Sequence, residues 1–191
     1  MEKLDLRKQL KHLYLPGSKL VEVIEVPPLK FAMIDGQIES VGGPSQSPAF
    51  QQAMEAMYGI SYTLKFMSKL RKENPIDYTV MALEALWWVE GVEFDITKPV
   101  GWHYTAMMLQ PDHITEAMFQ DALAQLRKKK PSPALDLLRL ETFHEGLSMQ
   151  IMHIGPYSAE PATIAKMDAF AKENGYVQRG KHHEIYLGDP R

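Results

Sequence analysis

The chain has 191 residues, enough for one sizeable core, and its 45% hydrophobic and 24% charged residues are typical of a globular protein. A net charge of −3 gives no electrostatic basis for binding nucleic acid or an anionic membrane. No apolar run approaches the ~20 residues of a membrane span, and the absence of cysteine excludes disulfides and a thiol nucleophile. The polar N-terminus lacks a signal-peptide core, so we expect a cytoplasmic protein.

The first third of the chain contains an arm, an interrupted strand and a helix. In residues 1–19, leucines alternate with basic residues before a Pro-Gly break, which predicts a short amphipathic arm over the main body. Residues 21–26 and 30–37 are interpreted as one strand interrupted by two prolines, which a central ladder does not tolerate. Ser47 and Pro48 then predict the N-cap and first residue of a helix that ends before Asn74.

A long hairpin and a second helix follow. Residues 76–89 are expected to form a strand, in which the adjacent Trp87 and Trp88 must point to opposite faces. After a loop at 90–101, residues 102–110 are expected to form the return strand. Thr115 is the predicted N-cap of a helix that ends at residue 130 in a basic run, which suits the helix dipole.

The last third repeats this order. Strands are predicted at 138–143 and 147–154, and a helix capped by Ser158 is expected to end at the Asn-Gly pair 174–175. The final stretch, 181–191, alternates like a strand. We expect Ile185 to face the helices, whereas Glu184 and Tyr186 face the other way.

An internal repeat supports an α+β fold. The segment 43–49 is similar to 155–162; each follows a strand and opens a helix, and each helix leads to a strand with one glutamate, Glu84 or Glu184. A duplicated strand-helix-strand-strand unit is therefore predicted, with halves at about 20–113 and 138–191 linked by the helix at 115–130. The chain stops where the last strand of the second half would begin. The seam between the halves is a natural ligand site.

The motifs resemble those of one known family. The Gly-Pro-Tyr before the last helix, the Leu-Glu-Ala-Leu-Trp-Trp strand and the closing His-His-Glu-Ile-Tyr-Leu-Gly-Asp-Pro-Arg are similar to motifs of the GyrI-like small-molecule-binding family. The resemblance covers residues 20–191. It implies two βαββ modules of the SHS2 type, which form a joined antiparallel sheet with helices on one face and a ligand cleft on the other. That family shares the effector-binding domain of multidrug-responsive regulators.

The resemblance also implies a site. The glutamate that pairs with cationic aromatic ligands in drug-sensing relatives matches Glu184. A stand-alone branch of the family has no DNA-binding domain, and residues 1–19 likewise show no helix-turn-helix pattern. This branch includes detoxifying hydrolases that open the cyclopropane of DNA-alkylating cyclopropanoids. For such a reaction we expect Glu184 to activate water and Tyr157 or Tyr186 to donate to the ligand oxygen. The expected ligand-binding residues are Trp87, Trp88, Trp102, Tyr104, Glu84, His153 and His182.

Several alternatives remain open at this point. Glu184 is either a pocket acid or a core carboxylate satisfied by a neighbour, and Glu84 is either its partner in the cleft or a surface residue. The whole protein is either a hydrolase, a non-catalytic binder of planar aromatic molecules, or a gyrase inhibitor like the founding member of the family. We expect no cofactor and no metal, because His182 and His183 point to opposite faces of the strand. An exposed sheet edge allows a homodimer.

Overall fold

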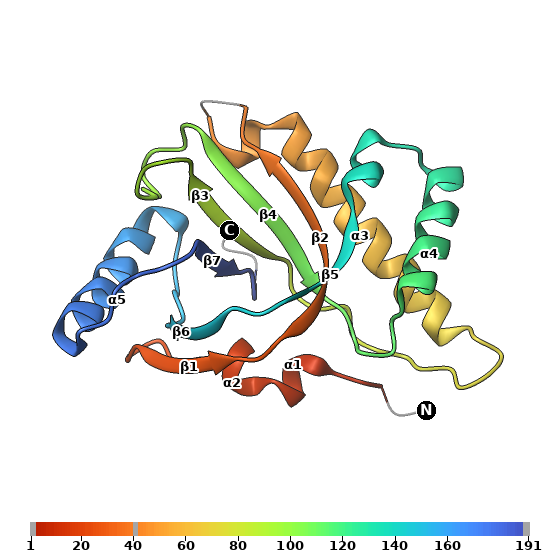
Figure 1. Ribbon diagram of the computed structural model, residues 1–191, viewed down its shortest axis with the longest axis horizontal. Helices are drawn as coiled ribbons and strands as arrows, with labels where there is room; N and C mark the ends of the chain where they lie inside the picture. Colours follow the sequence, from red (N-terminus) through yellow and green to blue (C-terminus); the bar gives the residue numbers. More distant parts are fainter. Residues whose placement is uncertain (1–2, 40–41, 189–191) are drawn as a thin grey trace.

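The computed structural model describes residues 3–39 and 42–188 and shows a mixed α+β fold (Figure 1). The last three residues of the closing motif and the first two of the arm lie outside this range. The helices are α1 (Leu6–Gln9), α2 (Lys11–Tyr14), α3 (Pro48–Lys69), α4 (Glu116–Lys129) and α5 (Glu160–Asn174), with short 3-10 turns η1 (Pro44–Gln46), η2 (Pro133–Leu137) and η3 (Tyr157–Ala159). The strands are β1 (Glu22–Val26), β2 (Leu29–Gln37), β3 (Glu84–Val89), β4 (Trp102–Leu109), β5 (Arg139–Phe143), β6 (Gly146–Gln150) and β7 (His182–Ile185).

The strands form two antiparallel sheets. The pairing of β1 with β6 in one sheet continues along the chain into the pairing of β2 with β5 in the other. The larger sheet has the order β5-β2-β4-β3-β7, and the smaller one pairs β1 with β6. Leu29 pairs with Phe143 in the first sheet, and Val26 pairs with Gly146 in the second. The two prolines at 27–28 interrupt the ladder on one side because they have no N–H to donate. The expected single interrupted strand is therefore two strands in two sheets.

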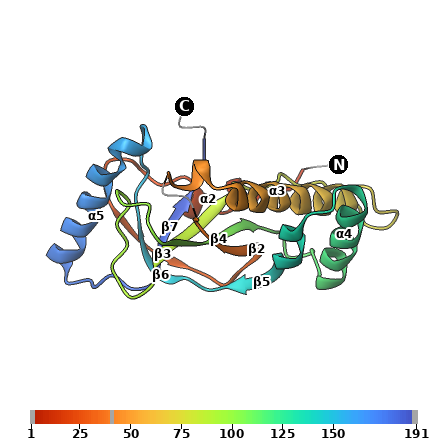
Figure 2. The ribbon, with the colours of Figure 1, turned by 90° about the horizontal axis from the view of Figure 1, so that it is seen from above.

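Helix α3 covers one face of the larger sheet, with α4 beside it (Figure 2). Its N-cap is Ser47, whose Oγ accepts a hydrogen bond from the Phe50 N–H at 3.1 Å, and Pro48 occupies the first turn. Thr115 caps α4 in the same way, so both predicted helix starts are confirmed. The buried stripe of α3 includes Met57, Ile60 and Leu64, each fully buried against the sheet.

The duplicated unit is visible in the connections. In the first half the order β2–α3–β3–β4 places β4 between β2 and β3. In the second half β6–α5–β7 repeats the first three elements, and α5 lies at the end of the molecule opposite α4 (Figures 1 and 2). Among the described residues, β7 pairs only with β3 and β6 only with β1, so no described strand lies between β6 and β7.

Three local predictions were wrong. Residues 76–83 are not a strand, because the only β-type pairing of this segment in the described chain is an isolated bridge between Tyr78 and Leu4. Ser158 does not cap α5; it lies inside η3, and the helix begins at Glu160 with Pro161 in its first turn. Ile185 does not face the helices, because it pairs with Glu84 on the face opposite α3.

The N-terminal arm lies against the body of the protein. Leu13 and Tyr14 of α2 are 4% and 1% exposed, and both belong to the hydrophobic core. No helix within residues 3–39 and 42–188 is long and apolar enough to cross a membrane. The arm therefore contributes packed side chains to the same core as the sheets.

The Ser47 cap gives the first prediction. The variant Ser47→Ala should lower the free energy of unfolding by ~1–2 kcal/mol, because the Phe50 N–H and the Glu39 carboxylate each lose a hydrogen-bond partner. Urea unfolding would measure the change. The matched control is Ser45→Ala, which alters an exposed serine two residues earlier; equal stabilities of the two variants would contradict the capping role.

Candidate functional site

Strand β7 presents two chemically different faces. In the β3–β7 ladder, Glu184 lies opposite Ala85 and His183 lies opposite Leu86. Paired residues share a face and neighbours in a strand alternate. His183 therefore belongs to the Glu84 face, whereas Glu184 belongs to the face that α3 covers. The two glutamates singled out by the repeat lie on opposite sides of the sheet.

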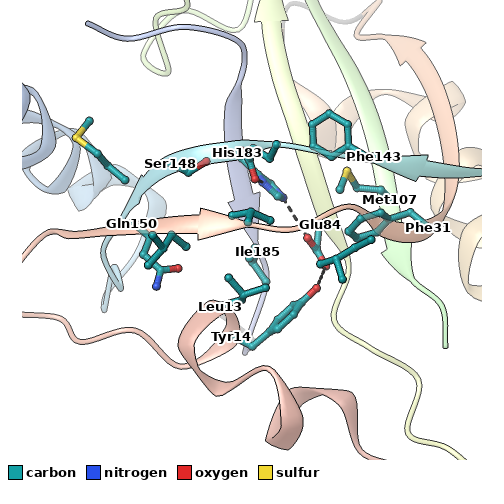
Figure 3. Close-up of a pocket in the computed structure, with 15 residues that line it drawn as sticks. Leu13, Tyr14, Phe31, Glu84, Met107, Phe143, Ser148, Gln150, His183 and Ile185 are labelled. Atoms are coloured by element: carbon teal, nitrogen blue, oxygen red, sulfur yellow. Dashed lines mark hydrogen bonds and ion pairs between the residues drawn. The ribbon is translucent and has the colours of Figure 1, made fainter. Parts of the chain in front are cut away.

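The face opposite α3 carries a buried hydrogen-bonded network (Figure 3). Glu84 is 1% exposed, accepts from the Tyr14 hydroxyl at 2.6 Å and lies 3.1 Å from Nε2 of His183. Nδ1 of His183 lies 3.0 Å from Oε2 of Glu145. A small cavity of about 80 Å³, with apolar walls that include Phe31 and other core side chains, adjoins the network. Glu84 is thus a satisfied core carboxylate that anchors the arm to β3 and β7.

The charges in this network favour a protonated imidazole. Burial alone would lower the pKa of His183, but its hydrogen bonds to Glu145 and Glu84 outweigh burial and raise that pKa to about 10. Burial and the charge of Glu84 raise the pKa of Tyr14, so its hydroxyl stays a donor. An imidazolium held between two carboxylates fixes β7 against β3 and against the loop before β6.

On the other face, Glu184 is held by two neighbours, Tyr186 and His182. Its Oε2 accepts a 2.5 Å hydrogen bond from Tyr186, whose hydroxyl oxygen accepts from Nε1 of Trp87 at 3.1 Å. Its Oε1 lies 3.3 Å from Nε2 of His182, and the His182 ring is stacked on Phe94. Burial, followed by the charge of Glu184, raises the pKa of Tyr186 well above its usual value. Tyr186 therefore orients the carboxylate by donating to it.

A large cavity lies between β6, β7 and α5, and it is lined by Glu184 as well as by residues such as Glu145, His183 and Ile185. Its volume is about 890 Å³, in the range of small-molecule sites. Glu184, Tyr186, Tyr157, His153 and His182 all line it, so the structure brings these five predicted residues together. The remaining wall is mainly apolar and includes Met152, Ile154, Ile164, Met167, Tyr176, Val177 and Leu187.

Sequence reasoning missed Glu160, a second acid of this cavity. Glu160 begins α5, and its Oε2 is buried without a hydrogen-bond partner among the described residues. Burial, and next the charge of Glu184, raise the pKa of Glu160, which His182 and His153 oppose. The sequence did hold a signal for the position of Glu160. It stands immediately before Pro161, which marks the first turn of the helix and so places Glu160 at the helix start.

The predicted aromatic walls lie behind the cavity. Trp87, Trp102 and Tyr104 are 3%, 7% and 2% exposed, and none lines the cavity directly. Phe50 of α3 packs on Trp87 and edge-on against Tyr104, and the Tyr104 ring fills the place that a Cβ at Gly36 would need. These rings are core. Trp87 still reaches the site through its hydrogen bond to Tyr186.

The other predicted ligand-binding residues divide between the faces. Trp88 lies on the Glu84 face, where Nζ of Lys181 sits 3.1 Å from its ring centroid and His103 stacks on it. His153 ties the chain after β6 to the start of α5, since Nδ1 lies 2.8 Å from Thr163 Oγ1 and Nε2 lies 3.2 Å from the Pro156 carbonyl. Trp88 is thus remote from Glu184, whereas His153 helps to shape the cavity.

Glu160, His182 and Glu184 form a compact cluster, with one oxygen or nitrogen of each within 4.8 Å of the others. Both oxygens of Glu184 and Nε2 of His182 are already engaged in hydrogen bonds within the site. An ion would have to displace these hydrogen bonds, and our expectation of a metal-free site stays a prediction.

Comparison with known proteins identifies the class to which this fold and site belong. The sequence profile of the GyrI-like small molecule binding domain matches residues 109–191. Among curated proteins, none matches the chain. Two solved structures from Listeria innocua, an uncharacterized conserved protein and a hydrolase, are each 37% identical with a TM-score of 0.86. The alignments cover 98% and 99% of this chain and 92% of each of those chains.

A further Listeria innocua structure described as a hydrolase is 36% identical over 98% of this chain and 91% of its own, with a TM-score of 0.81. Similarity at this level over nearly the whole chain shows common ancestry as well as a common fold. The chain belongs to the GyrI-like small-molecule-binding family, as the motifs predicted.

The His183 network gives the second prediction. The native state holds a proton that the unfolded state loses above the ordinary histidine pKa of 6.5, so this contribution is complete below pH 6.5 and is lost as pH rises towards 10. Wild-type stability should fall by up to about 1.4 kcal/mol per pH unit in this window, and His183→Gln should remove that slope. Urea unfolding at pH 7, 8 and 9 measures it.

The control is His144→Gln, which alters a histidine that is 57% exposed and should keep the wild-type slope. If His183→Gln and the wild type lose stability in parallel over this pH range, then the imidazolium assignment is wrong.

Proposed function

We propose that the protein binds a flat, hydrophobic aromatic molecule in the cavity beside β7 and adds water to a strained cyclopropane fused to it. The observation that carries the proposal is the Glu184 carboxylate, which is held at the wall of an apolar cavity by Tyr186 and His182. The family membership supports a small-molecule ligand, and the hydrolase descriptions of two relatives support water as co-substrate.

The reaction requires few groups. Glu184 accepts a proton from a water molecule, and the water oxygen bonds to the cyclopropane CH₂. The C–C bond that breaks releases its electron pair into the dienone ring, which becomes a phenolate. Tyr157 lines the same cavity from the turn before α5 and supplies a hydroxyl to the ligand oxygen. Tyr186 acts through Glu184 rather than on the ligand, because its hydrogen bond points to the carboxylate.

The same geometry favours a second candidate function. Glu160 and Glu184 are the two carboxylates of the cavity cluster, and in the described chain neither forms a salt bridge to lysine or arginine. An acidic pair whose salt-bridge partner in the described chain is His182 suits a planar aromatic cation. A protein that only sequesters such cations would bind them in saturable fashion and return them unchanged.

The variant Glu184→Gln distinguishes the two functions. With a duocarmycin-type spirocyclopropyl dienone, mass spectrometry should show a gain of one water with the wild type and at least a ~100-fold slower reaction with the variant. Tryptophan quenching should show similar ligand affinity in both, because amide and carboxylate have nearly the same shape.

Glu73→Gln, which changes an exposed acid outside the cavity lining, is the control and should react like the wild type. Binding without any water adduct in the wild type would instead support sequestration. Equal turnover by wild type and Glu184→Gln would refute the role of Glu184.

A further inference from the structure

Glu160 is the carboxyl group that clusters with Glu184 in the cavity lining. Its side chain reaches the cavity from the first residue of α5, one turn after Tyr157, whereas Glu184 reaches it from β7. Atoms of the two carboxyl groups lie within 4.8 Å of each other. Two carboxyl groups this close do not ionise independently, and one tends to retain a proton.

The contacts of the two acids differ. Glu184 accepts from Tyr186 and lies within hydrogen-bond distance of His182, so its environment favours an acceptor. Glu160 has a buried oxygen, Oε2, without any partner among the described residues. A buried carboxylate oxygen without a donor is costly, whereas a protonated carboxyl that awaits an acceptor fits such a position.

We infer that Glu160 is the proton donor of the site and delivers its proton to the ligand oxygen on which negative charge develops. This assignment rests on the hydrolysis proposed above and names its acid. The surroundings agree with it, since burial and the charge of Glu184 both raise the pKa of Glu160.

The step balances with two acids and one water. Water loses a proton to Glu184 as its oxygen bonds to the CH₂, and the pair from the broken C–C bond becomes the phenolate. Glu160 gives its proton to that oxygen and becomes ionised, so the product is a neutral phenol with a new primary alcohol. Return of the proton from Glu184 to Glu160 through a water molecule between the two acids, whose atoms lie within 4.8 Å, restores the starting state.

The experiment compares Glu160→Gln with the wild type on the spirocyclopropyl dienone. Gln keeps the shape but has no acidic proton, so kcat should fall ~100-fold or more with KM nearly unchanged. The wild-type rate should decline at alkaline pH as Glu160 ionises, and this limb should be absent in the variant. The titratable groups whose charges act on the pKa of Glu160 are Glu184 and His182 from β7 and His153 from the segment after β6.

Two further proteins make the result decisive. Glu160→Asp retains an acidic proton and should recover part of the lost rate, which a purely structural role would not produce. Glu173→Gln removes an exposed carboxylate from the same helix and should leave the rate unchanged. Circular dichroism verifies that each variant is folded.

The protonation of Glu160 can also be measured without turnover, by following the chemical shift of its carboxyl carbon by NMR as the pH is changed. In the wild type it should titrate above the ordinary range of glutamate, and Glu184→Gln should shift its midpoint downwards. If the wild type reacts and Glu160→Gln is equally fast, the acid assignment is overturned and the proposed hydrolysis stands. If the wild type forms no water adduct, both are overturned.

Discussion

The imidazolium of His183 is the interaction on which the arrangement of β7 depends. It lies between Glu84, which belongs to β3 (Figure 3), and Glu145, which belongs to the turn before β6. Strand β7 has only four residues and, in the described chain, one strand neighbour, so its ladder alone is a weak constraint. The buried ion pairs fix the orientation of the His183 ring as well as attracting it, because each ring nitrogen lies against one carboxylate.

This anchor determines the position of Glu184 on the opposite face. Since successive side chains alternate, a strand that is fixed through His183 presents Glu184 to the cavity in one orientation. Tyr186 and Trp87 then hold the carboxylate from the core side, and His182 holds it from the side of the hairpin loop. The site is thus built on a strand whose far face is locked, the kind of support that precise chemistry requires.

Local patterns in the sequence predicted much of this architecture, whereas the partners of the site had to come from the structure. Ser47 and Thr115 marked two helix starts because a cap needs only the next three residues. Ser158 misled because the following Pro161 is the better marker of a first turn. Alternation placed Glu184 and Tyr186 on one face, yet the His183 contacts span 38 and 99 residues, a separation that no local pattern encodes.

The stacking residues show the same limit. Adjacent positions of Trp87 and Trp88 required opposite faces but left open which one is core; the structure buries Trp87, while Trp88 packs beside Lys181 on the other side. Periodicity could not predict that Trp102 packs against Phe94 and Tyr104 against Phe50, so that neither ring lines the cavity. The apolar wall of the cavity instead includes side chains of α5 and its flanks, such as Ile164, Met167 and Tyr176.

The two faces of β7 differ in charge compensation, and this difference indicates where function resides. On the Glu84 face, buried carboxylates are balanced by an imidazolium and a phenol, which is the usual condition of a structural network. On the Glu184 face, two carboxyl groups meet under apolar walls, and the described chain places no lysine or arginine salt bridge on either. Such an arrangement lowers stability, since a buried acid without a cation must either hold a proton or wait for a ligand. Proteins retain that cost where chemistry or recognition uses it, which supports our proposal that the ligand binds beside Glu184.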